Sequence, residues 1–185
     1  MRKILASLIC GIFLTATAAE YEIDPNHANA RFKIDHFQTS SNVGGFFGLT
    51  GKIEFDKEKE TGSVEIKIPL SALNSGNAKF DEHLKSSDLF DAEKFPEMSF
   101  ESEKFIFKDG KLAEVEGKLT IKGKTNPVTL KAKQFNCYEN PMFKAEVCGG
   151  DFSTKIDRTA FGIDYLADKI SKSVAIKIQI EAVKK

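Results

Sequence analysis

The sequence predicts an all-β protein, an eight-stranded antiparallel β-barrel with a short helical insertion around residues 78–92. Three observations lead to this fold class. Apolar and polar residues alternate with period two along most of the chain, which is typical of half-buried antiparallel strands. Turn signals such as Asp109-Gly110 separate these segments at short intervals. The alternation stops between Asn77 and Phe100, and short connections around one interrupting helix favour a meander closed into a barrel.

The alternating segments define the expected strands. The last is the clearest, since Val174, Ile176, Ile178 and Ile180 all fall on one face. In chain order the expected strands are 21–36, 46–57, 63–71, 97–107, 112–122, 126–138, 143–156 and 170–183. Strands of ten or more residues reach over about 30 Å. An eight-stranded barrel of that height is either filled by side chains or encloses one ligand.

The insertion carries bulky apolar side chains in a segment too polar to be a strand. Phe80 and Leu84 lie four residues apart, as on one face of a helix, and Phe90 and Phe95 follow before Pro96. A short helix with such side chains needs a concave surface to bury them. A lid over an apolar cavity would supply one.

Aromatic composition bears on whether the barrel is filled. Beyond residue 19 the chain has 15 phenylalanines, three tyrosines and no tryptophan. Phenylalanine lines oily cavities without needing hydrogen-bond partners, and it also simply fills cores. Several phenylalanines lie outside the alternating strands, and this favours a cavity: Phe80, Phe90, Phe95 and Phe161.

The first residues have the pattern of a secretory signal peptide. Arg2 and Lys3 precede an apolar run over 4–14, and small residues give a cleavage site near Ala18/Ala19. The run is too short to span a bilayer. We therefore expect a cleaved signal over 1–19, a single domain over 20–185, and a periplasmic or secreted protein without stable membrane insertion.

The charge balance excludes some partners. Removing the predicted signal leaves 25 basic and 27 acidic residues, a net charge of −2. Nucleic acids and anionic membrane surfaces are bound through a basic excess or patch, and none is evident. We expect no nucleic-acid partner.

Two cysteines remain after the predicted signal, Cys137 and Cys148. In an exported protein such a pair most often forms a structural disulfide. The alternative is a redox or metal-binding pair, although the spacing is not that of a CxxC motif and no histidine is nearby.

The sequence contains no recognisable catalytic or metal-binding motif. His27 and His36 are nine residues apart, so on one strand they would face opposite sides, and His83 has no second histidine at helical spacing. No zinc-ligand pattern, GxSxG elbow, HExxH motif or phosphate-binding glycine loop is present. We therefore expect structural histidines, no metal, no cofactor and no enzymatic activity.

Arg158 lies among apolar residues in the segment 156–162. It has two interpretations. It pairs structurally with Asp157 or with a carboxylate across the barrel, or its planar guanidinium meets a polar or anionic head group of a ligand.

Several segments resemble one known family, the YceI-like proteins, which are bacterial polyisoprenoid-binding proteins of the periplasm with a lipocalin-like barrel. They occur in the family's order over nearly the whole mature chain: 21–27, 45–48, 81–86, 89–92, 95–96, 117–123, 127–128 and 158–163. The resemblance implies a carrier or storage protein for a long-chain amphiphile. The sequence departs from the family's pattern at Phe80, where relatives usually have arginine. This departure favours a ligand with a neutral or less charged head group.

Pattern and resemblance together predict a binding protein for a polyisoprenoid, an isoprenoid quinone, or a fatty acid or amide. The expected ligand-contacting residues are Phe46, Phe47, Phe80, His83, Leu84, Phe90, Phe95, Phe100, Leu119, Ile121, Arg158, Phe161 and Ile178. Two alternatives stay open: an enzyme acting on such a lipid through His83 and Asp81 or Glu82, and a filled barrel without ligand that serves stress response or interactions. Separately, an exposed strand edge near the barrel seam could pair two subunits into a homodimer.

Overall fold

The computed structural model describes residues 18–185, so nearly all of the predicted signal peptide lies outside the described residues. The strands are β1 Ala19–Ile23, β2 Asn29–His36, β3 Ser40–Phe46, β4 Thr50–Asp56, β5 Thr61–Pro69, β6 Leu73–Asn74, β7 Glu97–Lys108, β8 Lys111–Ile121, β9 Lys124–Asn140, β10 Ala145–Asp157 and β11 Ile170–Lys184. The helices are α1 Ala78–Lys85 and two 3-10 helices, η1 Leu70–Ala72 and η2 Arg158–Phe161.

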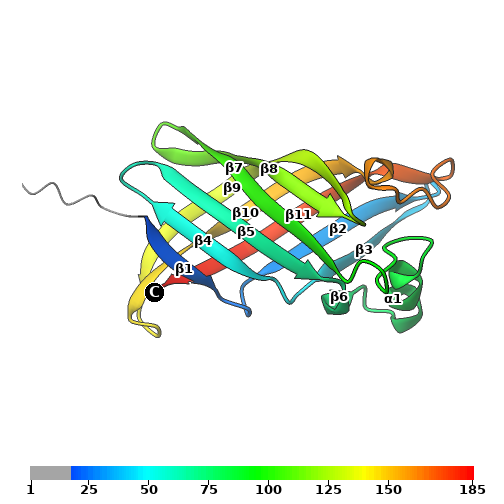
Figure 1. Cartoon of the computed structure of the whole chain (residues 1–185), viewed down its shortest axis with the longest axis horizontal. Helices are drawn as coiled ribbons and strands as arrows, with labels where there is room; N and C mark the ends of the chain where they lie inside the picture. Colours follow the sequence, from blue (N-terminus) through cyan, green and yellow to red (C-terminus); the bar gives the residue numbers. More distant parts are fainter. Residues whose placement is uncertain (1–17) are drawn as a thin grey trace, which may run out of the picture.

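Eight strands form a closed antiparallel barrel, which confirms the predicted fold class. Their order is β1-β4-β5-β7-β8-β9-β10-β11, and β11 pairs again with β1 through Tyr21↔Lys184 and its neighbours. Figure 1 shows the strands running obliquely along the barrel, with α1 at one end and the C-terminus at the other. The predicted hairpin at Asp109-Gly110 is a tight turn in which both residues have positive φ, 51° and 69°.

Two predicted strands were wrong in their bounds. The segment 21–36 is broken, and β2 continues the line of β1 beside β11. The break falls at Asp24-Pro25, where the Asp24 carboxylate accepts the N–H of Asn26 and Pro25 has no N–H to donate to a ladder. The segment 46–57 begins too early, because β4 starts only at Thr50, and the separate strand β3, Ser40–Phe46, was not predicted.

The helical insertion is shorter than the predicted 78–92. Helix α1 begins after Asn77, whose side chain accepts a hydrogen bond from the N–H of Phe80 (3.2 Å), and it ends at Lys85. The following residues fold back on the helix as turns, since the N–H of Phe90 donates to the carbonyl of Leu84 (3.0 Å). The insertion therefore forms one compact unit at the end of the barrel.

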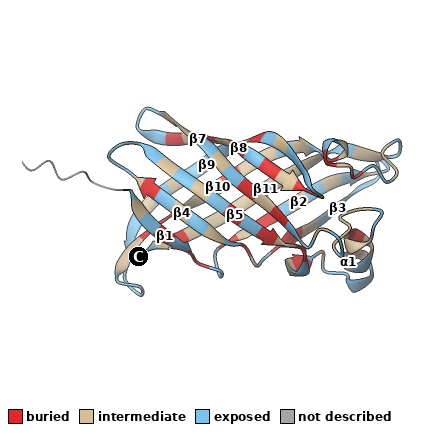
Figure 2. Ribbon diagram, in the orientation of Figure 1, coloured by how far each residue is buried: buried red, intermediate tan, exposed pale blue. Residues whose placement is uncertain are grey.

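Along the strands, buried and exposed residues are interspersed, as Figure 2 shows. The inward residues form the principal core, to which Leu84 of α1 and Phe161 of η2 also belong. None of the helices within residues 18–185 has the length and apolar character needed to span a bilayer.

Candidate ligand-binding site

The interior of the barrel holds a cavity of about 410 Å³. Its lining is mostly aliphatic and aromatic. Every strand except β6 contributes to it, and so does the insertion around α1. It includes most of the predicted ligand-contacting residues: Phe46, Phe80, His83, Leu84, Phe90, Phe100, Leu119, Ile121, Arg158 and Ile178. A volume in this range is typical of pockets that bind small molecules.

Three predicted ligand-contacting residues lie outside the lining. Phe47 is 50% exposed on the outside of the barrel. The ring of Phe95 packs over Gly123 and under the Lys94 ammonium, which lies 5.2 Å from the ring centroid. Phe161, the last residue of η2, is buried in the core. An apolar side chain outside the strand pattern was therefore not sufficient to identify a lining residue.

One end of the cavity carries polar side chains, which we call the mouth: His36, Asn42, His83 and Tyr165. The rings of His83 and Tyr165 contact each other edge to face, with centroids 5.2 Å apart. The turn between β2 and β3, helix α1 and the segment after η2 meet at this end of the barrel (Figure 1). The mouth thus offers imidazole, amide and phenol groups to a polar head group. Sequence reasoning identified only His83 as a ligand contact. His36 and Asn42 lie at the adjoining ends of β2 and β3, Tyr165 lies in the segment after η2, and no motif marks any of them.

Helix α1 and the turns after it form one side of the mouth. The Asp81 carboxylate accepts the N–H of Ser75 (2.8 Å) and fixes the entry to the helix. On the inner side, Leu84 is buried, and Phe90 meets Phe46 edge to face with centroids 5.9 Å apart. The apolar face of the insertion therefore lies against the cavity, as expected of a cover.

Arg158 forms no pair with Asp157, contrary to the structural interpretation from the sequence. Instead, Asp157 caps η2 by accepting hydrogen bonds from the N–H and hydroxyl of Thr159 (2.9 and 2.7 Å). The guanidinium of Arg158 donates to four backbone carbonyls, those of Ile163, Tyr165, Ile170 and Ser171, at 2.7–3.1 Å. Burial lowers the pKa of Arg158, and the carboxylates of Asp164 and Asp157 oppose that shift.

These four hydrogen bonds hold the segment from 158 to 171 around the Arg158 guanidinium. The segment includes Tyr165, whose ring contacts His83 at the mouth. Four of the five guanidinium donors are thereby used within the protein. Arg158 positions the mouth and has little remaining capacity to bind a head group.

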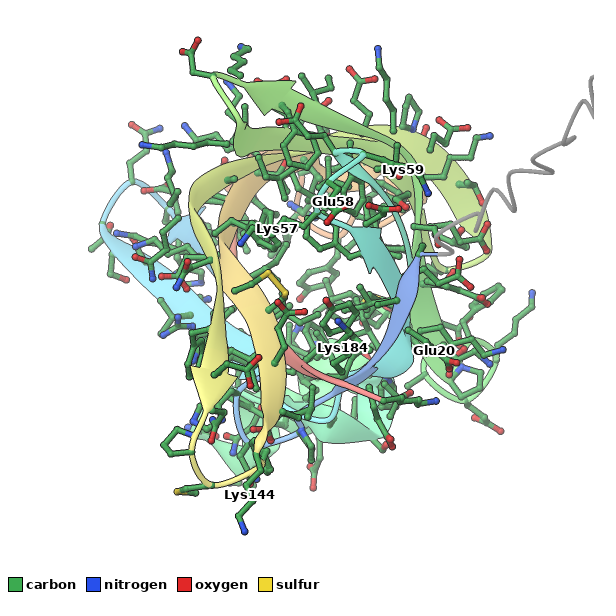
Figure 3. The ribbon with its side chains drawn as sticks, turned by 90° about the vertical axis from the view of Figure 1, so that its left-hand side faces the viewer. Glu20, Lys57, Glu58, Lys59, Lys144 and Lys184 are labelled. Atoms are coloured by element: carbon green, nitrogen blue, oxygen red, sulfur yellow. A yellow bond between two sulfur atoms is a disulfide. The ribbon has the colours of Figure 1, made fainter. Side chains whose placement is uncertain are left out.

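The opposite end of the cavity, which we call the distal floor, is formed by four buried residues and one half-buried residue: Tyr21, Phe55, Cys148 and Ala182, with the half-buried Phe135. Figure 3 looks onto this end of the barrel, where the yellow disulfide lies in the wall and Lys144 marks a hairpin that projects outward.

The predicted disulfide is present and joins neighbouring strands. Cys137 of β9 and Cys148 of β10 face each other in register, with Cα atoms 4.0 Å apart. The two sulfur atoms are thus bonded to each other, as the structural interpretation of the cysteine pair predicted. The residues described here contain no group of three or more histidine, cysteine or acidic side chains arranged to hold a metal ion.

His27 has a structural partner. Its Nδ1 lies 2.7 Å from Oδ2 of the buried Asp24, at the break between β1 and β2. That hydrogen bond raises the pKa of His27 and lowers the pKa of Asp24.

Known proteins share this fold and sequence pattern. A UPF0312 protein of Vibrio parahaemolyticus is 33% identical over 93% of this chain and 91% of its own length. The crystal structure of Burkholderia cenocepacia BcnA matches 86% of this chain and 99% of its own, with a TM-score of 0.73 and 23% identity. A polyisoprenoid binding domain from Saccharophagus degradans, implicated in plant cell wall breakdown, matches 92% of this chain and all of its own, with a TM-score of 0.63 and 11% identity. At such identities the two structures show a shared fold. Residues 21–182 match the YceI-like domain, and the chain belongs to the YceI-like family.

Proposed function

We propose that the protein binds one long-chain amphiphile, with the tail in the barrel and the head group at the mouth. The observation that carries this proposal is the apolar cavity, which has the polar side chains of His36, Asn42, His83 and Tyr165 at its mouth. The ligand classes that fit are polyisoprenoids, isoprenoid quinones, and fatty acids or amides. The printed description of the Saccharophagus degradans domain as polyisoprenoid binding supports the first class.

The driving force for such binding is burial of the tail. Each buried methylene contributes roughly 0.8 kcal/mol. A tail of about twenty carbons therefore offers enough free energy to exceed an immobilisation cost of several kcal/mol. The mouth residues need to satisfy only the few polar atoms of the head group.

We also propose that the protein acts in the periplasm or outside the cell. The predicted signal peptide supports export, and the Cys137–Cys148 disulfide fits an oxidising compartment. A carrier in such a compartment would hold a water-insoluble chain away from water.

Binding fits the site better than catalysis. Asp81, one of the two predicted acid–base partners of His83, accepts a hydrogen bond from the N–H of Ser75 at the entry to α1. Glu82, the other, is exposed and does not line the cavity. Neither placement favours the enzyme alternative. The filled-barrel alternative is disfavoured by the open interior.

The homodimer remains a prediction. The outer edge of β3 pairs with β6 only at Gly45 and Phe46, and this leaves Ser40–Gly44 unpaired on that side. Unpaired edges are templates for strand addition. Sedimentation of the mature protein at several concentrations would test this point.

Native mass spectrometry of protein purified without detergent tests the proposed function. We expect an added mass of several hundred daltons that prenols, quinones or fatty amides displace. Ile178→Trp should fill the cavity and remove the added mass. Lys177→Trp should retain it, because Lys177 is the exposed neighbour on the same strand. Protein that is empty and binds none of these amphiphiles would contradict the proposal.

A further inference from the structure

The two ends of the cavity differ in exposure. At the distal floor the exposed fractions are 3% for Tyr21, 4% for Phe55 and 2% for Ala182. Near the mouth, Phe37 and Tyr165 are 45% and 38% exposed. All five residues line the cavity. The cavity is therefore more enclosed at the distal floor than at the mouth.

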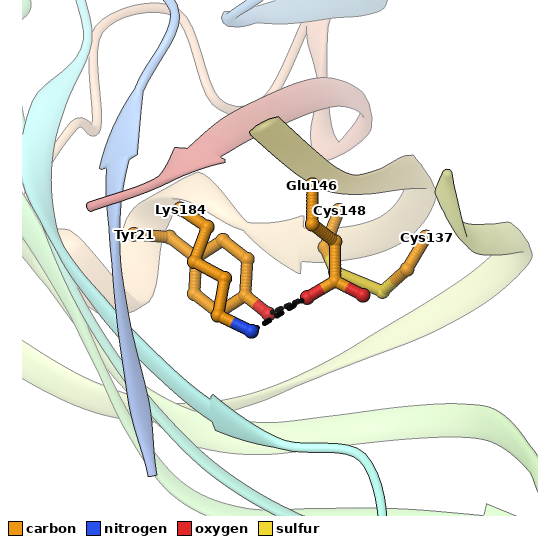
Figure 4. The surroundings of a disulfide bond; sticks show 5 residues. All are labelled: Tyr21, Cys137, Glu146, Cys148 and Lys184. Carbon is orange, nitrogen blue, oxygen red and sulfur yellow. Dashed lines mark hydrogen bonds and ion pairs between the residues drawn. A yellow bond between two sulfur atoms is a disulfide. The ribbon is translucent and has the colours of Figure 1, made fainter. Parts of the chain in front are cut away.

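Tyr21 is held at the distal floor by a hydrogen bond from its hydroxyl. Its hydroxyl donates to Oε1 of Glu146 (2.8 Å), and the ammonium of Lys184 reaches the same oxygen at 3.2 Å. Figure 4 shows both side chains converging on this carboxylate beside the disulfide. Burial and the neighbouring Glu146 raise the pKa of Tyr21, which favours the protonated phenol that donates this hydrogen bond.

The contact spans the seam where the barrel closes. Tyr21 of β1 and Lys184 of β11 face each other in register, and Glu146 lies on the next strand, β10. A ring held from three strands cannot swing aside without breaking the seam contacts. Tyr21 is thus a fixed part of the floor.

The disulfide and an aromatic cluster support the rest of the floor. Phe135 precedes Cys137 by two residues on β9, so both side chains point to the same face of the strand. The ring of Phe135 meets Phe55 edge to face with centroids 5.3 Å apart, and Phe55 stacks on Phe107 at 6.4 Å. The wall on this side is covalently joined to β10 through Cys148.

We propose that the distal floor sets the longest tail the protein accepts, with the Tyr21 ring as the stopper. This inference rests on the proposed function, because it concerns the tail of the amphiphile bound in the cavity.

The depth of the cavity gives an expected limit. On β11, Ile170 lies at the mouth opposite His36, and Ala182 lies at the floor. Twelve residues at 3.3 Å each give about 40 Å along the strand, and a tilt of about 40° reduces this to about 30 Å along the axis. An extended chain advances about 1.2 Å per bond. The cavity should therefore accept roughly two dozen carbons.

The test is a homologous series of straight-chain fatty acids from about 12 to 30 carbons, measured by competition against a fluorescent fatty acid. The wild-type protein should bind about fourfold more tightly per added methylene until the limit, and then gain nothing. Tyr21→Ala should move the limit several carbons longer. Ala182→Leu should move it two or three carbons shorter, because it adds side-chain volume at the floor. Met142→Ala, at the 84% exposed tip of the neighbouring hairpin, is the matched control and should leave the limit unchanged.

The outcomes separate this inference from the proposed function. A wild-type limit that shifts in opposite directions in Tyr21→Ala and Ala182→Leu supports the floor as the stopper. A wild-type limit that neither variant moves overturns the floor while leaving lipid binding intact. Absence of binding at every chain length overturns both. If Tyr21→Ala does not fold, Ala182→Leu alone decides the matter, since it keeps Tyr21 and its hydrogen bond to Glu146.

Discussion

Oδ2 of Asp24 and Nδ1 of His27 lie 2.7 Å apart at the break between β1 and β2. The backbone on either side of them is attached to β11, because the N–H of Asp24 donates to the carbonyl of Glu181 (3.0 Å) and the N–H of Glu181 donates to the carbonyl of His27 (3.1 Å). The pair therefore stabilises the bend between β1 and β2, both of which pair with β11.

This pair predicts a pH dependence of stability. The pKa of His27 is raised in the folded protein, so its contribution is fully present below about pH 6.5, the unfolded value, and is lost as pH rises through the folded pKa. The pKa of Asp24 is lowered, so its contribution is present above about pH 3.9 and is lost as pH falls through the folded pKa. The pair should stabilise most between about pH 4 and 6.5.

Urea unfolding of the wild type and His27→Ala from pH 5 to 8.5 checks the His27 side of this window. The difference in free energy of unfolding should be larger at pH 5.5 than at pH 8.5. It should change by less than about 1 kcal/mol, because the His27 side chain is 51% exposed and solvent screens the pair. His36→Ala is the control, since no ion pair of His36 is found in residues 18–185. Equal differences at both pH values would count against the pair.

Reduction of the disulfide should destabilise the barrel at the distal floor. Cys137 and Cys148 close a loop with a sequence separation of 11, for which the chain-entropy model gives about 3 kcal/mol. The free energy of unfolding in urea should fall by roughly that amount on adding a reductant. The double variant Cys137→Ser with Cys148→Ser should be insensitive to reductant. An unchanged midpoint for the reduced wild type would show that the disulfide contributes little to stability.

Replacing Arg158 should destabilise the mouth segment. Arg158→Ala removes four hydrogen bonds to carbonyls around a buried guanidinium, and we expect a loss of about 2–4 kcal/mol in the free energy of unfolding. Arg158→Lys should recover only part of it, because an ammonium cannot reproduce the planar fork. Arg31→Ala, at an exposed arginine on β2, should change stability by less than about 0.5 kcal/mol.

A ligand-binding role for Arg158 would give a different result. Arg158→Ala would then weaken binding of anionic amphiphiles while stability stayed near that of the wild type. Measuring both quantities on the same variants separates positioning of the mouth from contact with a head group.

The barrel could be predicted from the sequence because each strand is marked by a pattern among residues that are close together in the chain. Period-two alternation along β11 places Ile176, Ile178 and Ile180 on the face that lines the cavity. A one-residue slip would expose that whole face, so the pattern fixes both the strand and its inward side. The missed strand, β3, begins with Ser40, Ser41 and Asn42, where no apolar alternation marks it.

The mouth could not be predicted in the same way, because it is assembled from segments distant in sequence. His36, His83 and Tyr165 meet only after the barrel closes and Arg158 has folded the segment that follows it. Arg158 itself was identified as unusual, but its partners are backbone carbonyls, which no side-chain pattern reveals. Likewise, Phe47 and Phe80 look alike in the sequence, and only the fold places one outside and the other inside.

That difference between Phe47 and Phe80 provides a test of head-group selectivity. Phe80 lines the cavity on α1, at the position where the family pattern usually has arginine, whereas Phe47 is exposed outside the lining. A guanidinium near the mouth would pair with carboxylate or phosphate, and hydrogen bonds to charged groups contribute about 1.5–3 kcal/mol. Phe80→Arg should therefore favour an anionic amphiphile over its neutral amide or alcohol by about tenfold or more relative to the wild type.

Competition binding with a matched acid and amide of the same chain length measures this ratio. Phe47→Arg adds the same charge outside the cavity and should leave the ratio near the wild-type value. Thermal unfolding of both variants shows whether they remain folded, because Phe80 also packs against the core. If the two variants changed the ratio equally, the effect would come from overall charge, and α1 would have no part in recognising the head group. A change confined to Phe80→Arg would place the head group beside α1, at the end of the cavity where His83 and Tyr165 meet.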